Sequence, residues 1–162
     1  ETIERAEKLV RAHYPRTHRR QAWTLDTKAT ILQGAGRHAQ ALEVYRQALT
    51  LKLEILPKDD PDLSYAYAGI GQCQLALGHA ADAIPNLEEA LRLGGPDPIE
   101  RGDTRFALAR ALETRGKDAG RVQALLDGAL ADYAQAKRSD KRAEVEAWSL
   151  SRQETRTAAR GP

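Results

Sequence analysis

Few residues in this sequence combine the type and spacing that metal binding or catalysis requires. A metal site on one helix needs two ligands three or four residues apart, and no histidine here has a second histidine or cysteine at that distance. The histidines are instead expected at loops or helix starts: His13, His18, His38 and His79. The single cysteine, Cys73, cannot complete a structural zinc site or an internal disulfide, so we interpret it as a small buried side chain.

An acidic cluster at residues 59–62 offers oxygen ligands through Asp59, Asp60 and Asp62. It contains Pro61 and lacks the spacing of a calcium-binding loop, so we expect it to cap the helix that follows. The sequence shows neither a glycine-rich phosphate loop after a strand nor a nucleophile paired with a base. We therefore predict no catalytic residue, no cofactor and no metal, and a function other than catalysis.

The composition is that of a soluble globular domain, with 41% hydrophobic and 30% charged residues in a chain of 162. Neither nucleic acid nor a membrane is an expected partner, because the net charge is only +2 and no apolar run approaches ~20 residues. Two basic clusters, 16–20 and 137–142, are interpreted as solvated linkers, with binding to a partner as the minority alternative.

A cytoplasmic location is expected, because one lone cysteine suits a reducing compartment and no signal peptide opens the chain. The sequence contains no methionine at all, which leads us to expect a piece of a longer protein.

An internal repeat organises the elements of the chain. The stretch GRHAQALEVYRQAL at 36–49 returns as GHAADAIPNLEEAL at 78–91, so Gly36, Ala41 and Ala48 each meet the same residue type 42 positions later. A third and weaker copy follows, shifted by an extra residue. Such self-similarity at a fixed period is typical of stacked repeats.

Each copy contains two helical patterns, and no stretch alternates with a two-residue period for long enough to predict a strand. In the first copy, apolar or small residues from Ala22 to Leu32 follow one helix face, and glycine then ends the helix. Small residues recur where facing helices must approach closely, because a large side chain there would force the helices apart. Stacked helix pairs of this kind form a superhelix with an extended concave surface.

This pattern resembles the tetratricopeptide repeat (TPR) family over residues 1–136, in the longer, 42-residue style of kinesin light chains. The residues that carry the resemblance are Ala29, Gly36, Ala41, Tyr45 and Ala48, then Gly71, Gly78, Ala83, Leu87 and Ala90, and finally Ala109, Gly116, Val122, Leu126 and Ala129. The resemblance implies an all-α fold, a right-handed α-solenoid of antiparallel helix pairs. Similar arrays occur in bacterial signalling proteins, including serine/threonine kinases.

The repeat pattern divides the chain into one array. We expect residues 1–17 to be the second helix of a truncated repeat, followed by repeats at 18–59, 60–97 and 98–136. A capping helix is predicted at 137–157, with Val145 and Trp148 covering the last repeat, before a frayed tail at 158–162.

The first helices of the repeats are expected to line the concave groove. The predicted groove residues are Trp23, Asp26, Thr27 and Thr30, then Tyr65, Gln72 and Leu75, and finally Phe106, Arg110 and Glu113. One aromatic residue comes from each copy, and aromatic side chains concentrate binding energy at interfaces. Packing of Trp23 and Phe106 into an adjacent helix is the alternative for those two residues.

We therefore predict a non-catalytic protein–protein interaction module that binds a peptide or partner protein in its groove, within a larger signalling protein. Self-association, or a structural role as the regulatory tail of a bacterial kinase, is the alternative, because truncated solenoid ends expose apolar faces.

Overall fold

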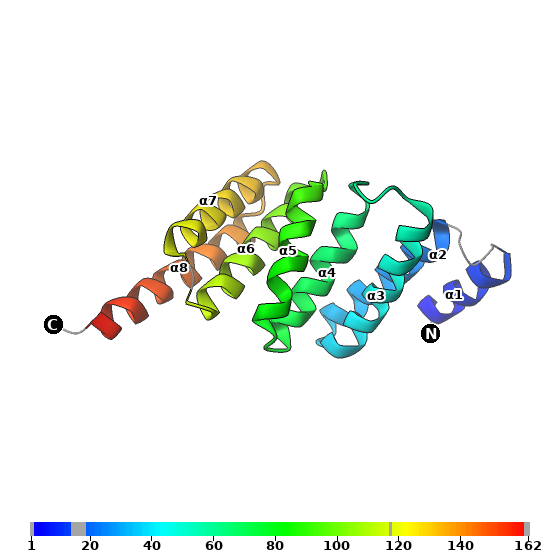
Figure 1. Cartoon of the computed structure of the whole chain (residues 1–162), viewed down its shortest axis with the longest axis horizontal. Helices are drawn as coiled ribbons and strands as arrows, with labels where there is room; N and C mark the ends of the chain where they lie inside the picture. Colours follow the sequence, from blue (N-terminus) through cyan, green and yellow to red (C-terminus); the bar gives the residue numbers. More distant parts are fainter. Residues whose placement is uncertain (1, 14–18, 117, 161–162) are drawn as a thin grey trace.

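The computed structural model describes residues 2–13, 19–116 and 118–160 and consists of eight helices arranged as an elongated array (Figure 1). The helices are α1 (Thr2–His13), α2 (Arg19–Gly34), α3 (His38–Ile55), α4 (Leu63–Ala76), α5 (Ala80–Leu93), α6 (Pro98–Thr114), α7 (Ala119–Gln135) and α8 (Ser139–Arg160). No strand occurs in the described part of the chain. The predicted all-α solenoid is confirmed.

Helices that follow one another in the chain pack against one another. The closest partners are α2 with α3, α4 with α5, and α6 with α7, and each pair also packs on the next. The two ends of the chain lie at opposite ends of the array (Figure 1). This arrangement is a stack of helix hairpins, in which each hairpin contacts only its neighbours.

The helices of the structure can be compared with the repeat boundaries expected from the sequence, and each helix pair falls inside one expected repeat. The three helix pairs lie within 18–59, 60–97 and 98–136. Helix α8 continues to Arg160, which corrects the expected end of the capping helix at 157. Its added residues remain helical because the amphipathic pattern of α8 meets no glycine or proline before residue 161. Residues 161–162, and the segment 14–18 that joins α1 to α2, lie outside the described residues.

Glycines end the first helix of each pair. Gly36, Gly78 and Gly116 have φ angles of 74°, 84° and 64°, in the left-handed region that other residues enter at a cost. The connection from α7 to α8 differs, because Lys137 adopts a φ of 56° there. The repeated glycines are thus needed for the reversal of chain direction within each pair.

Small residues fill the positions of closest helix approach, as the sequence predicts. Ala29, Ala41, Ala48, Ala109 and Ala129 are all fully buried. At Gly71 of α4, a Cβ atom would lie 2.5 Å from Cγ of Leu87, so only glycine fits between α4 and α5. Cys73 is fully buried too, and its burial raises the pKa of the thiol to about 11.

Candidate functional site

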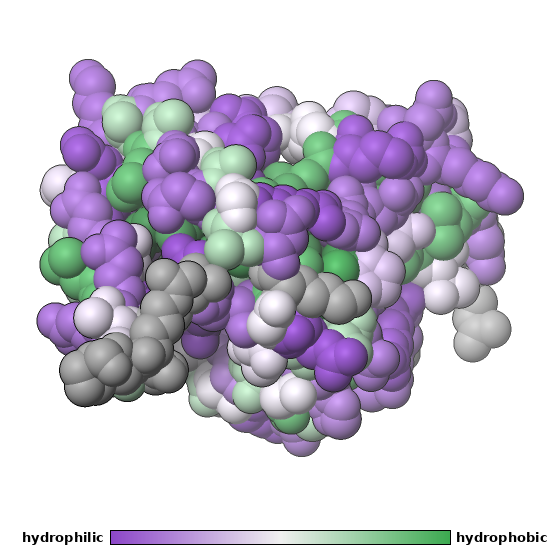
Figure 2. Space-filling model, turned by 60° about the vertical axis from the view of Figure 1, so that its left-hand side comes forward, coloured by the Kyte–Doolittle hydropathy of each residue, from purple (hydrophilic) through white to green (hydrophobic). Residues whose placement is uncertain are grey.

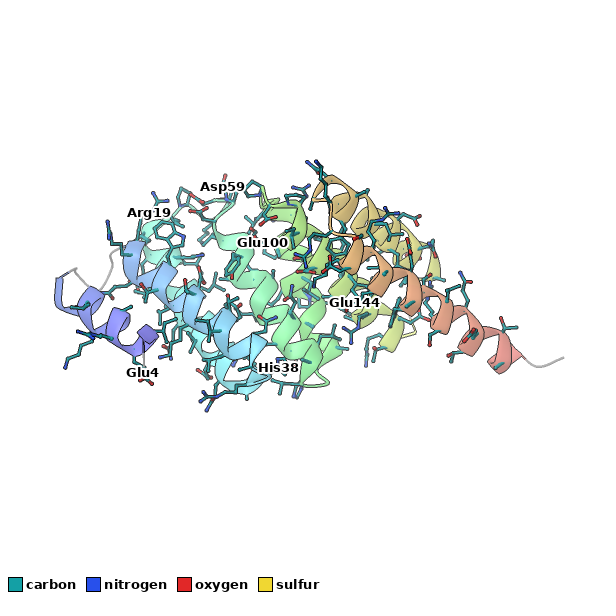
Figure 3. All side chains as sticks on the ribbon, turned by 180° about the vertical axis from the view of Figure 1, so that it is seen from behind. Glu4, Arg19, His38, Asp59, Glu100 and Glu144 are labelled. Atoms are coloured by element: carbon teal, nitrogen blue, oxygen red, sulfur yellow. The ribbon has the colours of Figure 1, made fainter. Side chains whose placement is uncertain are left out.

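The candidate site lies on the side of the array formed by the first helix of each pair. Helix α4 contacts both α2 and α6, so these three helices form one continuous wall. Helix α8 extends the wall beyond α6, and the view from behind brings α2 and α8 forward (Figure 3). Eight of the ten predicted groove residues fall into three groups: some are hydrogen-bonded to one another, some are buried, and some line a cleft. The other two, Trp23 and Thr27, lie near the start of the wall.

The first group is a hydrogen-bond network between α2, α3 and α4. The Thr30 hydroxyl bonds with the hydroxyls of both Tyr45, at 3.1 Å, and Tyr65. Tyr45 in turn donates to Gln33 Oε1 at 2.9 Å, and Gln33 donates to Gln72 Oε1 at 2.7 Å. Burial raises the pKa of Tyr65, so its phenol stays protonated and able to donate at neutral pH. Thr30, Tyr65 and Gln72 therefore hold the wall together.

Asp26 belongs to the second group, and its predicted place in the groove is wrong. Its side chain is only 6% exposed and lies 2.5 Å from the Nζ of Lys52, a buried residue of α3. Burial raises the pKa of Asp26, while Lys52 lowers it. Asp26 turns away from the groove because the Lys52 ammonium, itself 2% exposed, needs a buried counter-charge.

Phe106 is also buried, at 7% exposure, which corrects its expected role as an open groove residue. The cause is α8: the Trp148 ring packs edge-on against the Phe106 ring, with centroids 5.6 Å apart. Val145, one turn earlier on α8, is fully buried against the same core. The predicted covering of the last repeat by Val145 and Trp148 is confirmed, and it removes Phe106 from the surface.

Trp23 and Thr27 lie near the start of the wall. Trp23 is 36% exposed, and the guanidinium of Arg19 lies 4.5 Å from its ring centroid. Arg19 also pairs with Asp62 at 3.3 Å, which ties the start of α2 to the turn before α4. The Thr27 hydroxyl donates to the Trp23 carbonyl oxygen at 3.0 Å. Trp23 remains partly exposed beside Arg19, whereas the hydroxyl of Thr27 is engaged by its own helix.

The third group lines a cleft of about 510 Å³ between α4, α6 and α8. Leu75, Arg110 and Glu113, three of the predicted residues, come together there. The other lining residues are Gly78, Ala80, Thr114, Trp148, Ser151, Arg152 and Thr155. Figure 2 shows the molecule turned so that the α7–α8 end comes forward. The surface in this view is mainly hydrophilic, with smaller hydrophobic areas between the hydrophilic ones. A cleft that combines apolar side chains with a few charged ones is the usual form of a binding site.

Sequence reasoning missed the contribution of α8 to this cleft, because it treated α8 as a cap alone. Arg152 lies on the same helix face as Val145 and Trp148, at spacings of seven and four residues. An arginine that continues an apolar face is a signal that could have found it. In the structure its Nε donates to Glu113 Oε2 at 2.8 Å, and its side chain is 6% exposed.

The described residues contain no group of three histidine, cysteine or acidic side chains placed to hold a metal ion. In the same part of the chain, no helix has the length and hydropathy of a membrane span. The cleft therefore offers hydrogen bonds, one ion pair, one exposed guanidinium and apolar surface, which are the means of non-covalent recognition.

Comparison with known proteins agrees with the fold. Residues 20–94 match the family model for the tetratricopeptide repeat. "Tetratricopeptide repeat protein 36" of Bos taurus is 32% identical over 110 residues, which are 67% of this chain and 54% of that protein. The chain thus spans about half the length of the curated relative that it matches.

Two solved structures show the same architecture. The first is a Podosopora anserina kinesin light chain protein, described as having "nearly identical TPR-like repeats". It superposes on this chain with a TM-score of 0.68 at 19% identity, and the match covers 98% of this chain and 79% of that one. BtubC (BKLC) from P. vanneervenii gives a TM-score of 0.65 at 23% identity, covering 88% and 58%. The segment that matches the family model of the tetratricopeptide repeat, residues 20–94, spans α2 to α5. Repeats of this family are in general protein–protein interaction modules.

Proposed function

We propose that this chain binds a peptide segment of a partner protein in the cleft between α4, α6 and α8. The observation that carries the proposal is the meeting of Leu75, Arg110 and Trp148, from three different helices, around one open volume. Leu75 and Trp148 offer apolar contact, while Arg110 offers a charged one. Aromatic and arginine side chains are the residue types that most often dominate binding energy at interfaces.

A pair of variants on α8 tests the proposal. Ser151 is exposed and lines the cleft, whereas Gln153 is exposed on α8 and does not line it. Ser151→Trp should fill the cleft and Gln153→Trp should not, although both add the same side chain to the same helix. Peptides selected on the wild-type chain from a displayed library of random twelve-residue peptides should lose binding to Ser151→Trp and keep it with Gln153→Trp. Equal binding to both variants would refute the cleft as the site.

Self-association is a second candidate, which Leu150 favours. This large apolar side chain is 61% exposed on α8, so a second chain could cover it. Light scattering of the wild-type chain and of Leu150→Glu tests this candidate, since a strict monomer in both cases would exclude it. The kinase context and a role in bacterial signalling stay proposals that rest on the family resemblance. The cytoplasmic location stays a proposal that rests on the single cysteine.

A further inference from the structure

Arg110 is a cation that the described residues leave without a carboxylate. No acidic side chain among them forms an ion pair with it, although this part of the chain holds many such pairs. Its guanidinium carbon lies 5.7 Å from the centroid of the Phe106 ring, and its side chain is exposed at the cleft. A guanidinium stacked on a ring is held in place while its donors remain available to a ligand.

The carboxylate that stands one helical turn away is engaged elsewhere. Glu113 follows Arg110 at a spacing of three residues on α6, a spacing at which Arg92 pairs with Glu89 in α5 at 2.6 Å. Here Arg152 of α8 pairs with the Glu113 carboxylate instead, through a hydrogen bond of 2.8 Å in which the Arg152 side chain is buried and the Glu113 side chain is partly exposed. Helix α8 therefore neutralises Glu113 and leaves the positive charge of Arg110 facing the cleft.

The remaining lining makes the cleft suitable for one kind of ligand. Among the described residues that line the cleft, the charged ones are Arg110, Arg152 and Glu113, and these three side chains together carry a charge of +1. Leu75 and Trp148 supply apolar surface beside that charge. A complementary segment needs a negative charge next to an apolar side chain.

We propose that the cleft receives a partner segment in which an aspartate or glutamate stands beside an apolar side chain. The carboxylate pairs with Arg110, and the apolar side chain packs against Leu75 and Trp148. This inference rests on the proposed function and adds the chemistry of the partner to it. Guanidinium groups suit such a partner, because their planar donors can bind both oxygens of a carboxylate at once.

The displayed library of random twelve-residue peptides tests the inference when it is selected on two proteins in parallel. Peptides enriched on the wild-type chain should carry aspartate or glutamate beside an apolar residue, and those enriched on Arg110→Gln should lack the acidic preference. The best wild-type peptide should bind about tenfold more weakly to Arg110→Gln, with partial recovery in Arg110→Lys. Arg46→Gln, which removes an exposed arginine from α3, is the matched control and should bind normally.

The outcomes separate the two proposals. Enriched peptides without acidic preference, or with the same preference on Arg110→Gln, would overturn the inference and leave peptide binding intact. No enrichment at all on the wild-type chain would overturn both. A wild-type dimer that dissociates in Arg110→Gln would show that a second copy, and not a partner segment, occupies the cleft. Circular dichroism of each variant shows that the helices are retained.

Discussion

The Nζ of Lys52 lies 2.5 Å from Oδ2 of Asp26, and together these two side chains form a buried ion pair between α3 and α2. Lys52 also donates to the carbonyl oxygen of Asp62, at 2.8 Å, just before α4. One ammonium group thus connects three segments: α2 and α3 of the first complete repeat, and the turn at the start of the second. The pair lies behind the wall of first helices, so it determines how the wall is assembled and is not open to a ligand.

Removing one member of this pair should be costly, because the other charge would stay buried without compensation. Asp26→Ala is expected to lower the free energy of unfolding by about 3 kcal/mol, measured by urea denaturation. The double variant Asp26→Leu with Lys52→Met replaces both charges by apolar groups and should recover at least half of that loss. A double variant as unstable as Asp26→Ala would show that the charges themselves stabilise the fold.

Gly71 and Gly34 form a matched test of close packing. A Cβ at Gly71 would lie 2.5 Å from Leu87 Cγ, whereas a Cβ at Gly34 would meet nothing within 4 Å. Gly71→Ala should therefore destabilise the chain by about 1–2 kcal/mol through overpacking. Gly34→Ala should be neutral or stabilising by up to about 1 kcal/mol, because alanine favours the helix. The same loss for both substitutions in thermal unfolding would contradict this account of the repeated glycines.

Lys137 stands where the chain leaves α7 with a left-handed backbone, at a φ of 56°. Gly94, the C-cap residue of α5, has a similar left-handed backbone, with a φ of 68°. Lys137→Gly should raise the free energy of unfolding by about 0.5 kcal/mol, since glycine enters this region without strain. The reciprocal change, Gly94→Lys, should lower it by about 1 kcal/mol. Urea denaturation of both variants measures the two signs, and a loss of stability in Lys137→Gly would refute the prediction.

Glu100, at the start of α6, predicts a pH dependence of stability. Burial, followed by repulsion from Asp97, raises the pKa of Glu100 from 4.5 to about 7, while Lys52 opposes the rise. Between these two values the folded state binds more protons than the unfolded state. This contribution to stability is therefore fully present below pH 4.5 and is lost as the pH rises through 7.

A neutral side chain at this position should remove that dependence. Glu100→Gln is expected to be more stable than the wild-type chain at pH 8, by on the order of 1 kcal/mol after allowance for solvent screening. The advantage should vanish at pH 5, where Glu100 is protonated. Urea denaturation at both pH values measures it, with the exposed Glu43→Gln as the control. An advantage of equal size at the two pH values would contradict the raised pKa.

The sequence alone determined the helix pairs and their stacking. Alanine and glycine recur at fixed intervals where two helix backbones pack closely together. The need for a small side chain at these positions is local and returns with each repeat. It therefore appears in the order of residues, as at Ala29, Gly71 and Ala109, and places Cys73 in the core.

The tertiary structure decided which polar and aromatic side chains face the cleft. Asp26 and Phe106 are predicted to face the groove, yet Asp26 pairs with Lys52 and the Trp148 ring packs against Phe106. From the sequence, Arg110 and Glu113 are both expected to face the groove. Arg152, 39 residues after Glu113, pairs with Glu113, and only this contact gives the two residues different roles. Pairing between charges depends on distances between helices distant in the chain, and no local spacing encodes those distances.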